Sequence, residues 1–307
     1  MKALAIAGRD IAPELMDVAE RDPGPGEVRV SVEAASINGF DLAVAAGRIW
    51  GSMRHEFPVV LGRDFAGTVE ALGADVTELA VGDRVASTIH AGLGPGALAE
   101  RVTQAASTLA KVPASLSSID AAAVPLAGVA ALDVLDAAQV GTGDVVLISG
   151  ATGGVGVLAV QLAAQRGARV IATAQPGAEA DTIMSFGAAQ SVDHTGDLAA
   201  QVRAIAPDGV DAAVHAAGDP AQLGSMLRPG GRLASLLGAG SDAVGRDDVT
   251  VVAVQSRATA EKIAGLLTEV AAGRLTVPVA ETYPLDKATD ALGAFTGSKI
   301  GKIVVTV

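Results

Sequence analysis

The sequence predicts an α/β fold of two domains, one β-rich and antiparallel and one built around a doubly wound parallel sheet. Short stretches of alternating apolar and polar residues, separated by turns, fill the first 112 or so residues. From about residue 120, apolar strands alternate with helical stretches, which is the pattern of a parallel sheet with helical crossovers. The tail after about residue 257 ends in an apolar strand, and we expect it to return to the first domain.

The N-terminal part shows its strand signals in order. Residues 1–7 predict a short strand, and 28–32 alternate apolar and polar residues after the turn Pro23-Gly24-Pro25-Gly26. Residues 68–73 repeat this alternation, and Gly82-Asp83 predicts a turn that enters a further strand. We therefore expect an antiparallel, partly barrel-like β domain.

The second part opens with residues 145–149, a continuous apolar strand of the kind that is buried on both faces of a parallel sheet. A helix is predicted over 155–166, where Leu158 and Leu162 stand four residues apart, and Gly167 is placed to end it. The remaining elements are expected in this order: strand 169–173, a helix ending near Gly187, strands 211–214, 232–236 and 249–254, a helix, a loop with Pro278 and Pro284, another helix, and strand 303–305.

Composition restricts the partners of this 307-residue chain. Its formal net charge is −12, and no run of Lys or Arg supplies the basic face that a nucleic acid or an anionic membrane would need. The absence of cysteine excludes disulfides, a catalytic thiol and a thiolate metal site. The N-terminus lacks the pattern of a signal peptide, and no apolar stretch approaches the ~18 residues of a membrane helix. We expect a cytoplasmic protein.

The segment Gly150-Ala151-Thr152-Gly153-Gly154-Val155-Gly156 follows one predicted strand and opens one predicted helix. In that position, Gly153 is expected to allow a sharp turn. Gly154 and Gly156 leave out side chains where a pyrophosphate or the next helix must come close. The N-terminus of the helix offers unpaired N–H donors and a partial positive charge to phosphates. The segment predicts a dinucleotide-binding turn, with residues 152–156 as cofactor contacts, against the alternative of a tight turn that binds nothing.

The end of the next strand favours one cofactor. Enzymes that use NAD place Asp or Glu there to hold the ribose 2′-hydroxyl, whereas this strand ends Thr173-Ala174-Gln175-Pro176. The absence of an acid removes the main repulsion against a 2′-phosphate and favours NADPH. The usual basic partner of that phosphate is missing as well, so NADH is not excluded.

Several motifs in a fixed order extend over nearly the whole chain. They are Ser36-Ile37-Asn38-Gly39-Phe40-Asp41, residues 58–69, Gly73, residues 82–85, residues 151–156, Pro229-Gly230-Gly231, Gly273 and residues 301–304. Together they resemble the zinc-independent quinone oxidoreductase branch, similar to zeta-crystallin, of the medium-chain dehydrogenase/reductase family. The resemblance implies a GroES-like catalytic domain over 1–119 and 257–307, a Rossmann domain over 120–256, and an active site in the cleft between them.

The resemblance also implies roles for single residues. Asn38 would contact the ribose beside the nicotinamide, with a turn-forming Asn as the alternative. Ala217, Gly218, Leu237 and Gly238 would face the nicotinamide, whereas Thr173, Ala174, Gln175 and His194 would lie at the 2′-phosphate end. Glu179 stands where a phosphate-binding lysine is common. Phe40 and Trp50 flank the expected substrate pocket, where stacking on a flat ring and simple packing are both open.

Zinc is not expected. Gly62-Arg63-Asp64 stands where zinc alcohol dehydrogenases have Gly-His-Glu, and the cysteine ligands have no counterpart. His55, His90, His194 and His215 show no ligand pair, and His215 is interpreted as a core residue. The catalytic tyrosine of some relatives is replaced by Ala43 or its neighbours. Tyr283, the only tyrosine, is expected to be structural in a C-terminal loop, so no catalytic acid is named.

The resulting hypothesis is metal-free hydride transfer from NADPH to a quinone or an activated alkene such as an enone. Two alternatives stay open: a 2-enoyl thioester reductase, which the acidic charge and the short loop 92–96 disfavour, and a non-catalytic NADPH-binding protein with a structural or regulatory role. A homodimer is expected, because strand 249–254 can pair with its twin across a two-fold axis. The sequence leaves the physiological substrate open.

Overall fold

The computed structural model describes residues 1–51, 53, 55–89 and 95–307. The predicted roles of His90 and of most of the loop 92–96 therefore lie outside the described residues. The chain forms two compact units: unit 1 comprises Met1–Leu126 and Ala258–Val307, and unit 2 comprises Ala127–Arg257. The division falls after Leu126 rather than after residue 119, because the helix that contains residue 119 packs against strands of unit 1.

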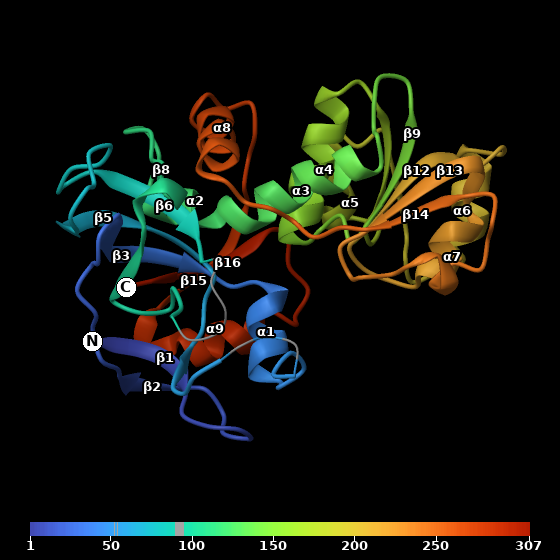
Figure 1. Ribbon diagram of the computed structural model, residues 1–307. Helices are drawn as coiled ribbons and strands as arrows, with labels where there is room; N and C mark the ends of the chain where they lie inside the picture. The colour runs from blue at the N-terminus through green and yellow to red at the C-terminus, as the bar shows by residue number, and fades with distance from the viewer. Residues whose placement is uncertain (52, 54, 90–94) are drawn as a thin grey trace. The chain divides into compact units, whose positions relative to one another are not determined.

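Unit 1 is built on β-sheets, as Figure 1 shows. A seven-stranded sheet has the order β15-β16-β3-β5-β6-β8, with β7 paired to β3, and a three-stranded sheet has the order β2-β1-β4. The strands are β1 (Lys2–Ile6), β2 (Glu14–Asp17), β3 (Glu27–Ser36), β4 (Val59–Val60), β5 (Asp64–Leu72), β6 (Arg84–Thr88), β7 (Arg101–Ala105), β8 (Ala110–Lys111), β15 (Val279–Pro284) and β16 (Lys302–Thr306). The helices are α1 (Gly39–Ala45), α2 (Ser118–Ala123), α8 (Ala260–Ala271) and α9 (Ala288–Ala294).

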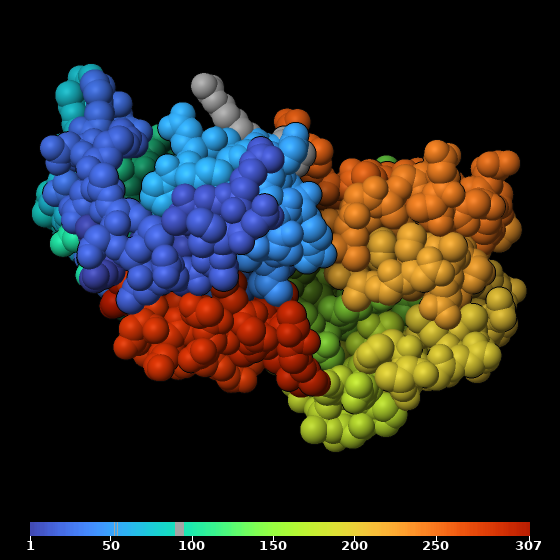
Figure 2. Space-filling view, turned by 90° about the horizontal axis from the view of Figure 1, so that it is seen from below, coloured from blue at the N-terminus to red at the C-terminus, as the bar shows by residue number. Residues whose placement is uncertain are grey.

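The core of unit 1 joins the two ends of the chain. Leu4 and Ile6 of β1 lie in one apolar cluster with Phe65 of β5, Ile303 of β16 and Leu292 of α9. Figure 2 shows the C-terminal segment, in red, against the N-terminal strands, in blue. The expected return of the tail to the first domain is thus what the contacts show.

The loop predicted around Pro278 and Pro284 is a strand, and this prediction was wrong. Residues of β15 pair in parallel with β16, with Tyr283 opposite Val305. β15 is the edge strand of its sheet. Proline is tolerated at an edge because its missing N–H leaves no partner unpaired there.

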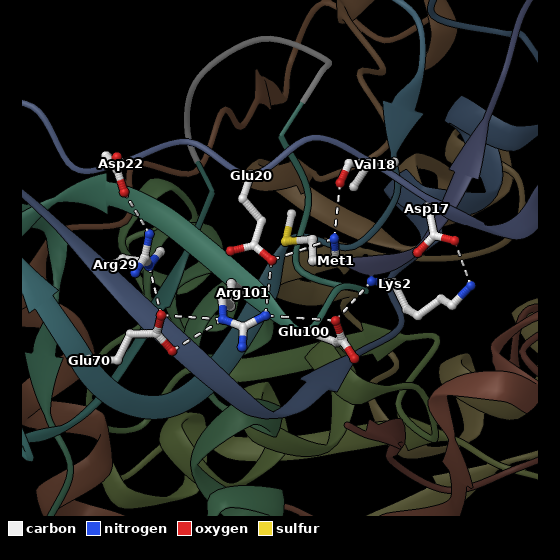
Figure 3. Close-up of polar contacts among 10 residues, drawn as sticks. All are labelled: Met1, Lys2, Asp17, Val18, Glu20, Asp22, Arg29, Glu70, Glu100 and Arg101. Atoms are coloured by element: carbon white, nitrogen blue, oxygen red, sulfur yellow. Dashed lines mark hydrogen bonds and ion pairs between the residues drawn. The ribbon is translucent and has the colours of Figure 1, made fainter.

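A row of alternating charges crosses three neighbouring strands of unit 1 (Figure 3). Glu70 on β5 accepts from Arg29 Nε on β3 at 2.7 Å and from Arg101 Nε on β7 at 3.2 Å. Arg29 continues the row to Asp22, and Arg101 continues it to Glu20. Opposite charges facing each other across strands favour this strand pairing over registers that would separate them.

Unit 2 contains a six-stranded, wholly parallel sheet in the order β11-β10-β9-β12-β13-β14. The strands are β9 (Val145–Ser149), β10 (Arg169–Thr173), β11 (Gln190–Val192), β12 (Val210–His215), β13 (Leu227–Ser235) and β14 (Thr250–Ala253). The helices are α4 (Gly154–Gln165), α5 (Ala178–Ser185), α6 (Leu198–Ile205) and α7 (Pro220–Ser225), while α3 (Pro125–Ala137) enters this unit from unit 1.

The strand order reverses between β9 and β12, as in a doubly wound nucleotide-binding sheet. Figure 1 shows α4 and α5 on one side of the sheet and α6 and α7 on the other. The predicted α/β class with a doubly wound sheet and a separate β-rich domain is confirmed. Among the described helices, none is both long and apolar enough to cross a membrane.

Candidate functional site

The turn between β9 and α4 is made by a different glycine from the one expected. Gly150, directly after β9, has a φ of +80°, in the region that favours glycine. Gly153 has an ordinary extended backbone, with φ −72° and ψ 166°, and forms the N-cap of α4. The sharp turn therefore belongs to Gly150, where a Cβ would also stand only 3.0 Å from Ala217 Cβ.

Gly156 allows α4 to lie directly against this turn. A Cβ at position 156 would stand 2.1 Å from Gly150 O and 2.6 Å from Ala151 Cα. Both contacts involve backbone, which cannot move aside as the end of a flexible side chain can. Gly153 supplies no side-chain cap, so the first N–H groups of α4 have no partner from the N-cap residue. Such groups are suited to phosphate oxygens.

A hollow of about 220 Å³ opens beside this turn, at the carboxyl ends of β9, β10 and β12. This is the place where the strand order reverses and where doubly wound sheets bind ligands. Of the residues predicted from the sequence, five line the hollow: Thr152, Thr173, His194, Ala217 and Gly218. Asp219 and Gln222 also line the hollow and were not predicted from the sequence, although Asp219-Pro220 is a helix-start signal shortly after β12.

The other predicted cofactor residues of unit 2 are not among the described residues that line the hollow. Gly154, Val155 and Gly156 form the first turn of α4. Ala174 is buried beyond the end of β10, and Gln175 is exposed. Leu237 and Gly238 follow β13 and face outward, with Leu237 61% exposed. The roles of these residues toward a cofactor stay predictions.

Buried hydroxyl and imidazole groups hold the loops around the hollow together. Thr173 Oγ1 accepts the Gly150 N–H at 2.9 Å and thereby links the end of β10 to the turn after β9. Ser149 Oγ donates to Ala217 O at 2.7 Å. The His215 ring contacts Ser235 Oγ at 3.0 Å and Gly218 O at 3.1 Å, and its side chain is buried. These contacts orient three loops at once, and the burial of His215 agrees with its interpretation as a core residue.

The carboxyl end of β10 carries an acid after all. None was predicted there, but Glu179 of α5 turns back and its Oε2 accepts the Gln175 N–H at 3.1 Å. The expectation failed because it considered only the residues that directly follow the strand. A side chain four residues later returns to the same place once the chain enters a helix.

These features fit a dinucleotide. The close approach at Gly156 leaves no room for a side chain, the first turn of α4 offers N–H donors, and the hollow lies at the strand ends. The arrangement can bind phosphates at the helix and a ribose beside β10.

In unit 1, Asn38 lies within a buried polar network. Its Nδ2 donates to Asp64 Oδ2 at 3.0 Å and to Ser36 O at 3.2 Å, and its Oδ1 accepts from Lys302 Nζ. The residue is only 8% exposed. Both ends of the amide are therefore engaged inside unit 1, and contact with a ribose stays a prediction.

Asp64 is the centre of this network. Its carboxylate also accepts from Ser36 Oγ and from the Leu126 N–H, each at 3.0 Å, and Lys302 Nζ lies 3.7 Å away. Asp64 and Lys302 are both almost fully buried. Burial lowers the pKa of Lys302, and the carboxylates of Asp64 and Asp41 act in the opposite direction.

Asp41 is a second buried acid in the same region. Its oxygens accept the backbone N–H groups of Asn38 at 2.8 Å and Gly62 at 3.1 Å. Burial raises the pKa of Asp41 to about 7, and the nearby charge of Asp64 adds to this effect.

The raised pKa predicts a pH-dependent stability. The pKa of Asp41 in the folded state, about 7, lies above the ordinary value of 3.8, so protonation of Asp41 favours the folded state. That contribution is complete below pH 3.8 and is lost as the pH rises through 7. Relative to Asp41→Asn, the wild type should lose roughly 3 kcal/mol of unfolding free energy between pH 5 and pH 8. Urea unfolding of both proteins at the two pH values measures this difference, and a pH-independent difference would contradict it.

Phe40 and Trp50 both lie in unit 1, but each faces its own partners. The Phe40 ring lies under the Arg63 guanidinium at 4.0 Å. Trp50 packs edge-on against His55, with ring centroids 4.9 Å apart, and against Phe57 at 5.1 Å. These contacts give both rings a packing role, and their predicted role toward substrate is untested.

Comparison with known proteins places this architecture in a family. Residues 24–114 match the alcohol dehydrogenase GroES-like domain, and residues 186–305 match a domain described as zinc-binding dehydrogenase. The quinone oxidoreductase of Coxiella burnetii is similar over 100% of this chain and 99% of its own, with a TM-score of 0.87 and 28% identity. The chain belongs to the medium-chain dehydrogenase/reductase family, in its quinone oxidoreductase branch.

Two further relatives of this dehydrogenase/reductase chain are informative. Mycobacterial Rv1454c, whose structure is a complex with NADPH, is similar over 100% of both chains, with a TM-score of 0.87 and 28% identity. A mycocerosic acid synthase-like polyketide synthase of Mycolicibacterium smegmatis is 32% identical over 96% of this chain. The chain spans only 15% of that synthase's length.

The description of the second matched domain mentions zinc, but the side chains at positions 63 and 64 have other roles in this chain. Asp64 uses its carboxylate for Ser36, Asn38, Leu126 and Lys302, and the neighbouring Arg63 is a cation. Within residues 1–307, apart from the seven that are not described, no group of three or more His, Cys, Asp or Glu is arranged to hold a metal ion.

Proposed function

We propose that this chain is a metal-free, NADPH-dependent reductase that transfers hydride to a quinone or an activated alkene such as an enone. The observation that carries this proposal is the hollow at the carboxyl ends of β9, β10 and β12, beside the close approach of Gly156 to Gly150. The similarity to a quinone oxidoreductase and to a protein complexed with NADPH supports the choice of reaction and cofactor.

In this mechanism the protein binds and orients the cofactor and excludes water from the site. NADPH, when bound, supplies the hydride. The first N–H groups of α4 would hold the pyrophosphate, and Thr173 keeps the turn in place by accepting the Gly150 N–H. Ser149 and His215 fix the loops that carry Ala217 and Gly218. These contacts would hold the cofactor in one orientation, and orientation is a main contribution that a protein makes to hydride transfer.

The kind of acceptor follows from the residues that the site offers. A quinone that accepts hydride becomes a stabilised anion, which water can protonate. A simple ketone needs a zinc ion, or a tyrosine with a lysine, to polarise its oxygen. The only tyrosine, Tyr283, lies on β15 with its hydroxyl on Glu281. An electron-poor acceptor therefore fits better than a simple ketone.

Turnover with a panel of acceptors tests the proposal. Purified protein should oxidise NADPH in the presence of 1,4-benzoquinone or an enone, which is followed at the absorbance of the reduced nicotinamide. No turnover with any quinone, enone or enoyl thioester would refute the enzymatic function. NADPH binding without turnover would instead favour a structural or regulatory nucleotide-binding protein.

A second candidate function is 2-enoyl thioester reduction. It is favoured by the 32% identity to part of a mycocerosic acid synthase-like polyketide synthase. Comparing crotonyl-CoA with 1,4-benzoquinone separates the two. A larger kcat/KM for crotonyl-CoA would select the thioester reductase.

We further propose a cytoplasmic homodimer that forms through β14. This strand is the edge of the unit 2 sheet and pairs only with β13 among the described strands. Pairing with the same strand of a second copy would cover the edge. Gel filtration at micromolar concentration should give the mass of a dimer, and a monomer would count against it.

A further inference from the structure

We propose that Glu179 controls the choice between NADPH and NADH. Its carboxylate lies at the carboxyl end of β10, where it opposes a 2′-phosphate and offers acceptors to ribose hydroxyls. NADH is then accepted beside NADPH. This inference rests on the proposed function, because it concerns the same nucleotide site.

The position of the carboxylate is defined by backbone contacts. β10 ends at Thr173, and the Ala174 N–H donates to Val192 O on the neighbouring strand at 3.0 Å. The next N–H, that of Gln175, donates to Glu179 Oε2 at 3.1 Å, and Gln175 O accepts the Ala180 N–H at 3.2 Å. These two hydrogen bonds close a turn over residues 175–180, and this turn holds the Glu179 carboxylate at the carboxyl end of β10.

The same strand end borders the hollow. Thr173, the last residue of β10, lines it, and so does His194, which follows β11. The Glu179 carboxylate accepts a hydrogen bond from the N–H of Gln175, two residues beyond Thr173. In doubly wound sheets, an acid at the end of this strand holds the ribose 2′-hydroxyl and excludes the 2′-phosphate. Here the acid comes from the first turn of the following helix instead of from the strand.

Charges near this strand end do little to favour a phosphate. The first turn of α5 carries two acids, Glu179 and Asp181. His194 stands beside Asp193, whose pKa is lowered by the N–H and hydroxyl of Thr195 and by His194. The His194 side chain is thus the one basic group among the described residues that line the hollow, and it is adjacent to an acid.

The matched control is present in the same helical turn. Asp181 is exposed, carries the same charge as Glu179 and lies two residues further on. If only net charge matters, substitutions at the two positions should have similar effects. If the position of the carboxylate at the strand end matters, only substitutions at Glu179 should change the choice of cofactor.

Calorimetric binding of four compounds tests this inference without turnover: NADPH, NADH, ADP-ribose and 2′-phospho-ADP-ribose. The wild type should bind each phosphorylated compound no more than about tenfold more tightly than its partner, because like charges at short range weaken binding on this scale. Glu179→Lys should shift both ratios toward the phosphorylated compound by roughly tenfold or more. Asp181→Lys should shift them by less than about threefold.

Glu179→Gln keeps a side-chain oxygen that can accept the Gln175 N–H while it removes the charge. It should shift the ratios in the same direction as Glu179→Lys but less. Equal ratios in wild type, Glu179→Lys and Glu179→Gln would overturn the inference, as would a wild type that already prefers the phosphorylated compounds about a hundredfold. If the wild type binds none of the four compounds, the proposed function fails as well. Binding with unchanged ratios refutes the role of Glu179 alone.

Discussion

Replacing Lys302 by methionine is expected to lower the free energy of unfolding by about 3–5 kcal/mol. Lys302 is the only cation within 4 Å of the buried Asp64 carboxylate among the described ion pairs, and its Nζ also donates to Asn38. Methionine has a similar length and no charge, so packing is largely kept. The loss then measures the cost of leaving the Asp64 carboxylate buried without a counter-charge.

Two companion variants make this result specific. Lys287→Met replaces an exposed lysine and should change the unfolding free energy by less than about 0.5 kcal/mol. Adding Asp64→Asn to Lys302→Met removes the uncompensated charge and should recover part of the loss. Urea unfolding followed by circular dichroism measures all three. A loss below about 1 kcal/mol for Lys302→Met would show that the pair contributes little.

Replacing Gly156 by alanine is expected to damage the nucleotide site directly. The new Cβ would stand 2.1 Å from Gly150 O, so α4 or the turn must move. We expect a loss of about 1–3 kcal/mol in unfolding free energy, despite the better helix propensity of alanine. The affinity for NADPH should fall by roughly tenfold or more, because the N–H donors of α4 move with the helix.

Gly265→Ala provides the control for helix propensity. Gly265 lies inside α8, and a Cβ there meets nothing within 4 Å. This change should stabilise the protein by about 0.5–1 kcal/mol and leave NADPH binding as it is. Thermal unfolding and calorimetric titration distinguish the two variants. Unchanged binding by a folded Gly156→Ala protein would show that the close approach is unimportant for the cofactor.

Much of the fold could be predicted because its signals are local. The strand 145–149 coincides with β9, and the helix expected over 155–166 is α4, one residue earlier at each end. Gly167 follows this helix with a φ of +81°, as a helix-ending glycine should. The prediction of a loop near Pro284 was wrong, because whether a proline is tolerated in a strand depends on which side of that strand is paired.

The candidate site was predictable only in part. The glycine-rich turn was recognisable, yet the sharp bend belongs to Gly150 and not to Gly153, because the backbone angles depend on surroundings such as the loop after β12, where Ala217 lies close to Gly150. An acid at the end of β10 was not expected, because Glu179 returns to Gln175 only after the chain has turned into α5. Asp219 was missed because its place beside β9 depends on the strand order.

By itself, the sequence predicted strands β9, β10, β12 and β13, helix α4, the presence of a β-rich and a parallel-sheet domain, and the glycine turn that opens α4. Periodicity and glycine spacing are properties of neighbouring residues, so they can be recognised without a structure. Only the tertiary structure decided the partners of the charged and polar side chains. Asn38 and Lys302 are separated by 264 positions, and they meet because β16 returns to pair with β3. No local pattern encodes such a contact, since it depends on where the whole chain has folded.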